Sequence, residues 1–177
     1  MASYYYLVAT LPSLRYDGKP AYSTAEFLSL CKEQVSDSHY QLISSAFSDT
    51  PQRNRFLEEY QKFSAMVNGE LTEQRSRKLS LSDSQYKNMH DKEARISETV
   101  RQALSMEDVL QAELLLLQLH WKFIEELVAL HTFDIEGLLG YALKLRLLQR
   151  KNLFTRDEGN AEFKRLFSNI QTEIENN

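Results

Sequence analysis

The sequence predicts an all-α protein: a multi-helix bundle around one central apolar helix, with a short extended or strand-like N-terminal arm. Glycine and proline are scarce, at five and three in 177 residues. This scarcity disfavours β-sandwiches and βαβ folds, which need many turns. The stretch from Ser105 to His131 is apolar over most of its circumference. Such a helix is usually covered on several sides, so we expect the rest of the chain to pack against it. Its narrow polar stripe comprises Gln111, Gln118, Lys122 and Glu125.

The N-terminal residues 4–11 are aromatic and apolar, and Pro12 follows them. Aromatic residues favour strands, and proline is confined to the ends and edges of strands. We therefore expect a short strand or extended arm that anchors the terminus on the core. The alternative is that Tyr4, Tyr5 and Tyr6 form an exposed patch that binds a partner.

Capping signals mark the next three helices. Ser23 and Glu26 form a capping box, in which a hydroxyl is followed three residues on by a carboxylate. Ser36 is placed to cap a second, short helix. Thr50–Pro51 is typical of a helix start, because proline suits the first helical position. Gly69 is expected to end this third helix. Its apolar face comprises Phe56, Tyr60, Phe63 and Val67.

Residues 70–104 are predicted to form a charged, projecting helical segment within a single domain that spans residues 1–177. Charges of both signs are dense there and apolar residues are sparse, which is typical of a solvated surface. The serines between Ser80 and Ser84 indicate a break. We expect an exposed hairpin or hinge rather than a piece of the core, with a docking surface as the alternative.

The central stretch predicts two helices joined by a corner at residues 132–134. Ser105 with Asp108 begins the first helix, and Asp134 with Glu136 begins the second. Four cations lie toward the end of the second helix, where they complement the helix dipole or meet an acidic partner. These cations are Lys144, Arg146, Arg150 and Lys151. A last amphipathic helix is predicted after a capping box at residues 155–158.

Composition excludes several classes of function. The net charge of −4 argues against nucleic acid as a partner. Cys31 is the only cysteine, so no internal disulfide can form, and it is expected to be a buried, inert thiol. The N-terminus lacks the pattern of a signal peptide, and no apolar run is long enough to span a bilayer. We expect a cytoplasmic protein.

No motif for catalysis, cofactor binding or metal binding stands out. The chain has no G-x-G-x-x-G, G-x-x-x-x-G-K, G-x-S-x-G or H-E-x-x-H pattern. His120 and His131 are eleven residues apart, which places them about 16 Å apart along a helix, too far to share one metal ion. We therefore predict a protein that is not an enzyme, with no catalytic, cofactor-binding or metal-binding residues.

Two stretches resemble an uncharacterised bacterial family encoded beside the genes of V-type ATPases. They are residues 5–14, YYLVATLPSL, and residues 133–146, FDIEGLLGYALKLR, followed by Arg150. The second stretch is also distantly similar to helices of the C/d connector of V-type ATPases. That connector is a helical socket between the rotating shaft and the membrane ring.

The resemblance implies a non-catalytic subunit or assembly factor of a bacterial V-type rotary ATPase, in the manner of a C/d-like connector between shaft and ring. Its partners would be proteins of the shaft or the ring, which would hold it at the periphery of the inner membrane. The expected contact residues are Tyr4, Tyr5, Tyr6, Lys144, Arg146, Arg150 and Lys151. The alternatives are a stand-alone helical adaptor and, third, a small helical enzyme.

Overall fold

The computed structural model describes residues 4–48, 53–81 and 93–154 of the chain. Within these residues it contains seven α-helices and no strands, which confirms the all-α prediction. The helices are α1 (Tyr5–Thr10), α2 (Thr24–Gln34), α3 (Asp37–Ser45), α4 (Arg55–Lys78), α5 (Ala94–Ser105), α6 (Val109–Leu127) and α7 (Ile135–Leu153). The helix predicted after Thr155 lies outside the described residues.

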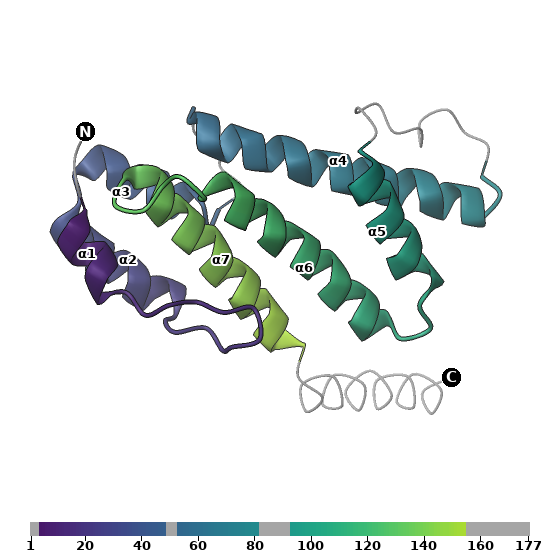
Figure 1. Cartoon of the computed structure of the whole chain (residues 1–177), viewed down its shortest axis with the longest axis horizontal. Coiled ribbons are helices and arrows are strands. Elements are labelled where there is room, and N and C mark those ends of the chain that lie inside the picture. Colours follow the sequence, from purple (N-terminus) through teal and green to yellow (C-terminus); the bar gives the residue numbers. More distant parts are fainter. Residues whose placement is uncertain (1–3, 49–52, 82–92, 155–177) are drawn as a thin grey trace, which may run out of the picture.

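The two long helices α6 and α7 run antiparallel through the middle of the molecule (Figure 1). Helices α1, α2 and α3 lie beside α7, whereas α4 and α5 lie on the far side of α6. A corner joins the two helices as predicted, but it is wider than residues 132–134, because α6 ends at Leu127 and α7 begins at Ile135. The predicted start at Ser105 is wrong, since Ser105 is the last residue of α5 and α6 begins at Val109. Aspartates cap both helices: Asp108 accepts backbone hydrogen bonds at the start of α6, and Asp134 does so at the start of α7.

Helix α6 is buried on two sides, as its sequence predicts. Leu117, Trp121 and Ile124 pack into a core cluster shared with α1, α2, α3, α7 and the start of α4. Leu116 and Leu119 pack into a second cluster shared with α4 and α5. The narrow polar stripe lets one helix contribute to both cores, and this gives α6 its central place.

The N-terminal arm is a correction to the prediction, because residues 5–10 form the short helix α1 rather than a strand or extended arm. Leu7 is buried, and Val8 and Leu11 pack against the same core. Their spacing of one and three residues matches one face of a helix. Tertiary packing therefore overrides the strand preference of the tyrosines. Residues 11–23, which follow, form neither helix nor strand and contain a turn in which the Gly18 N–H donates to the Arg15 carbonyl.

Helices α2 and α3 begin where their capping residues predict. The Ser23 hydroxyl accepts the backbone N–H of Glu26, and the Glu26 carboxylate accepts the backbone N–H of Ser23, which completes the capping box. Ser36 accepts the backbone N–H of His39 at the start of α3. These caps join residues three apart, which is why the sequence alone reveals them.

Helix α4 departs from both of its predicted ends. It begins at Arg55, with Asn54 Oδ1 accepting the backbone N–H of Leu57, rather than at Thr50–Pro51. It also continues through Gly69 to Lys78. A glycine in a helix costs about 1 kcal/mol relative to alanine, and burial of Phe63 and Val67 in the preceding turns offsets that cost. The helix ends at a turn in which Ser80 has a φ of 56°.

Helix α5 contributes to the second core rather than being only an exposed segment. Ile96, Val100 and Ala103 are buried against α4 and α6. They recur at spacings of four and three, so a narrow apolar stripe lies on a helix that is otherwise charged. The predicted break falls after Lys78, and residues 82–92 lie outside the described part of the chain.

Candidate functional site

The two stretches that carry the resemblance meet at the end of the molecule where α1 lies beside the corner between α6 and α7. The rings of Tyr5 and Phe133 are in contact, and the backbone N–H of Tyr4, just before the first stretch, donates to the carbonyl of Phe133 over 2.8 Å. Farther along, the Tyr141 hydroxyl donates to the carbonyl of Pro12 over 3.2 Å. The fold therefore joins segments that are about 130 residues apart in the sequence.

The three N-terminal tyrosines do not share one role. Tyr4 is buried, and its hydroxyl hydrogen-bonds His39 Nδ1 on α3. Tyr5 is 54% exposed and Tyr6 is 82% exposed. Tyr4 therefore anchors α1, as the anchoring interpretation predicts. Tyr5 and Tyr6 lie at the surface, as the partner-patch alternative predicts.

The exposed rings of Tyr5, Tyr6 and Phe133 pack on one another, and we call these three residues the aromatic end. The Tyr5 and Tyr6 centroids are 5.8 Å apart in an edge-on arrangement, and those of Tyr5 and Phe133 are 4.9 Å apart. Phe133 is 41% exposed. Leu130, in the same corner, is also exposed. Aromatic side chains gathered at a surface are typical of protein interfaces.

Each of the four predicted cations on α7 has a contact within the chain. The Lys144 ammonium lies 3.6 Å from Glu125 and 5.0 Å from the centroid of a Trp121 ring. Arg146 donates to the carbonyl of Ala46 over 3.1 Å. Arg150 pairs with Glu113. Lys151 donates to the carbonyl of Tyr16 and lies over its ring. These contacts tie α7 to its neighbours, and the role of the cations in partner binding stays a prediction.

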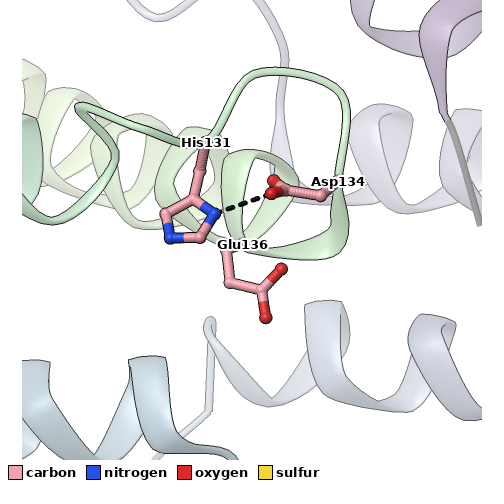
Figure 2. A group of neighbouring side chains, drawn as sticks. All are labelled: His131, Asp134 and Glu136. Carbon is pink, nitrogen blue, oxygen red and sulfur yellow. Dashed lines mark hydrogen bonds and ion pairs between the residues drawn. The ribbon is translucent and has the colours of Figure 1, made fainter. Parts of the chain in front are cut away.

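His131, Asp134 and Glu136 form a cluster at the corner, and their potential ligand atoms lie within 4.8 Å of one another (Figure 2). A 2.6 Å hydrogen bond joins His131 Nδ1 to Asp134 Oδ2, while Asp134 Oδ1 accepts the backbone N–H of Gly137 over 2.9 Å. Burial alone would raise the pKa of Asp134, but these two hydrogen bonds hold it below its usual value. The cluster therefore caps α7 and closes the corner.

Of the remaining candidate groups, Cys31 is buried and His120 is partly buried. Burial raises the pKa of the Cys31 thiol to about 12, so it stays protonated at neutral pH and is a poor nucleophile. His120 lies between α4 and α7, and its Nδ1 is 3.3 Å from the Tyr60 hydroxyl. Burial, with the positive charge of Arg150 as a second cause, lowers the pKa of His120 to about 4.

Sequence reasoning missed two features of this end of the molecule. Phe133 was expected only as part of the corner, because its contact with Tyr5 depends on the tertiary fold. The corner cluster has a signal in the sequence, His131-x-x-Asp134-x-Glu136, whose spacing brings the three groups to one turn. That signal crosses the gap between two helices, so the ligand spacings of one continuous helix do not reveal it.

A model of a protein family described as "Protein of unknown function (DUF2764)" matches residues 97–174. The match includes α6, α7 and the corner, and so contains the second of the two stretches that carry the resemblance. No curated protein and no solved structure matches the chain. Among the described helices, none is both long enough and apolar enough to cross a bilayer.

Proposed function

We propose that this protein is a non-catalytic subunit or assembly factor of a bacterial V-type rotary ATPase, which it contacts through the aromatic end. The observation that carries the proposal is the contact between the two resembling stretches, in which the Tyr5 ring packs on the Phe133 ring with centroids 4.9 Å apart. Residues that share a likeness to one family converge on one surface. That surface displays Tyr5, Tyr6 and Phe133 to solvent.

The chemistry of the aromatic end suits a protein partner. Tyrosine and phenylalanine offer large apolar areas with few rotatable bonds, so ordering them on binding costs little entropy. The contacts between the three rings already restrict them before a partner arrives. A partner that covers the rings removes apolar surface from water, and this is the main source of binding free energy at such interfaces.

The helices behind the aromatic end are suited to transmitting force. The corner cluster fixes the start of α7, and the Arg150–Glu113 ion pair joins the other ends of α6 and α7. A connector between a rotating shaft and a membrane ring needs helices that keep their relative positions. ATP hydrolysis would take place elsewhere in the complex, and this protein would contribute shape and rigidity.

A pull-down from native cells in gentle detergent tests the proposal. The tagged wild-type protein is expected to recover shaft and ring proteins in amounts near its own, as identified by mass spectrometry. A Tyr5→Ser/Tyr6→Ser variant should lose these proteins and keep its fold. The matched control is Val109→Ser/Leu153→Ser, which removes two apolar side chains that are 80% and 65% exposed. Val109 begins α6 and Leu153 ends α7, so both lie at the ends of these helices that are farthest from the aromatic end (Figure 1).

Two outcomes would contradict the proposal. Recovery of no ATPase component, even at low salt, would remove the assignment to the complex and favour the stand-alone adaptor. Recovery that is unchanged by the tyrosine substitutions would leave the complex in place but move the contact away from the aromatic end. If the protein is a connector, a deletion strain should also hydrolyse ATP without pumping ions, and coupled pumping in that strain would exclude this role.

A further inference from the structure

A cavity of about 550 Å³ lies where α3, α4, α6 and α7 meet, apart from the aromatic end. This volume is within the range of about 300–1,000 Å³ that is typical of small-molecule sites. One part of its wall is apolar and could hold a hydrocarbon body. That wall comprises Leu57, Leu116, Leu117, Leu143 and Leu147.

Polar side chains from three helices line the rest of the cavity. Tyr60 lies on α4, His120 and Glu113 lie on α6, and Arg150 lies on α7 with Arg146 one turn before it. The Tyr60 hydroxyl and His120 Nδ1 are hydrogen-bonded to each other over 3.3 Å. An apolar pocket with a few converging polar groups is the usual form of a ligand site.

The described lining residues include two arginines, whose guanidinium groups can donate hydrogen bonds to an anion. Burial keeps His120 neutral at pH 7, since its pKa is about 4. Burial also raises the pKa of Tyr60 to about 12, although the positive charges of Arg146 and Arg150 oppose the rise. The charged groups among the described lining residues are therefore two guanidinium groups and the carboxylate of Glu113.

Arg150 is placed to hold a ligand at the mouth of the cavity. Its Nε and Nη2 both donate to the same oxygen of Glu113, over 3.1 and 2.5 Å. A guanidinium group has five N–H donors, so this bond leaves donors for a second acceptor. The Arg150 side chain is 60% exposed, whereas Tyr60 and His120 lie deeper.

We propose that this cavity binds a small organic monocarboxylate, with the carboxylate at Arg150 and an apolar body against the leucine wall. The proposal is independent of the aromatic end and of the ATPase assignment. Arginine suits a carboxylate because its planar fork donates two parallel hydrogen bonds. The cavity thus offers a charged mouth and an apolar interior, which matches the two ends of such a molecule.

Titration calorimetry of the full chain with octanoate tests the proposal. We expect one octanoate per chain, with octanol and octylammonium binding at least tenfold more weakly because they lack the negative charge. Octyl phosphate, whose head group carries more charge in a larger volume, should also bind more weakly than octanoate. Equal binding of octanoate and octanol would overturn the assignment of an anion. Tighter binding of octyl phosphate would overturn the choice of a carboxylate.

Two variants locate the site. Arg150→Gln should weaken the binding of octanoate at least tenfold and leave the binding of octanol unchanged. The control is Arg101→Gln on α5, which removes an arginine from an exposed ion pair with Glu98 and should change the affinity for neither ligand. Ser64→Phe, which places a ring in the cavity, should abolish binding of both ligands. Circular dichroism checks that each variant is folded. Nuclear Overhauser effects between octanoate and the leucine methyl groups give a readout on the wild-type chain. Their absence, or unchanged binding in Ser64→Phe, would overturn the proposal.

Discussion

Gly140 on α7 lies directly against Val128 at the end of α6, so closely that a Cβ atom at position 140 would overlap the Val128 Cγ1 methyl group. The same Cβ would be 3.6 Å from Phe56 Cζ on α4. Three helices therefore approach one another at a position where only a hydrogen atom fits. This close approach sets the spacing of α6 and α7 just behind the aromatic end.

Gly140→Ala is expected to destabilise the protein by about 1–3 kcal/mol, the usual cost of overpacking a core. Helix propensity alone would give the opposite sign, since alanine is favoured over glycine by about 1 kcal/mol in a helix. Urea unfolding at pH 7 measures the change in the free energy of unfolding. Val128→Ala in the same chain should recover part of the loss, because it removes the methyl group that clashes. An increase in stability for Gly140→Ala alone would contradict the close approach.

His120 predicts a pH dependence of stability. Its pKa is about 4 in the folded protein and about 6.5 when unfolded, so the unfolded chain binds more protons between these values. Stability is therefore complete above pH 6.5 and falls as the pH is lowered toward 4. At 1.36 kcal/mol per pKa unit, the loss between pH 7 and pH 5 is about 2 kcal/mol. His120→Gln should remove this part of the slope in urea unfolding at the two pH values, and an unchanged slope would exclude His120 as its source.

Asp134 should add to the pH dependence of stability at lower pH, in the range where carboxylates titrate. Its pKa is lowered in the folded protein, so its stabilisation is present above its unfolded pKa of about 3.9 and is lost as the pH falls through the folded value. At pH 7, Asp134→Ala should cost about 1 kcal/mol through loss of the helix cap. Asp134→Asn keeps a capping oxygen and should cost less. Thermal unfolding at pH 7 and pH 3 tests this, since the difference between wild type and Asp134→Asn should shrink at pH 3.

Val100 tests whether α5 is part of the core. The side chain is fully buried between α4 and α6, so Val100→Ala should destabilise the protein by about 2 kcal/mol through lost burial and the resulting cavity. Arg101→Ala changes the neighbouring exposed residue, and it should alter stability by no more than about 0.5 kcal/mol. Urea unfolding of both variants gives the comparison. Equal, small effects would indicate that α5 is a peripheral segment after all.

The sequence by itself determined that the described chain is mainly helical and where α2, α3 and α7 begin. Ser23, Ser36 and Asp134 could be identified because a cap is a hydrogen bond between residues three apart. Asp108 was recognised only as the partner of Ser105, whereas it is the cap of α6 itself. The central place of α6 could also be predicted, because a helix that is apolar on most of its surface must be covered. These features depend on local chemistry and on composition, and both can be read from one chain.

Only the tertiary structure decided what depends on contacts between distant residues. The helical form of α1, the continuation of α4 through Gly69 and the burial of α5 each follow from packing that outweighs local preference. The same holds for the aromatic end, since Tyr5 and Phe133 are 128 positions apart and meet only when α1 packs beside the corner. Burial also fixes the neutral state of His120 and Tyr60, because desolvation depends on what surrounds a group and not on its neighbours in sequence.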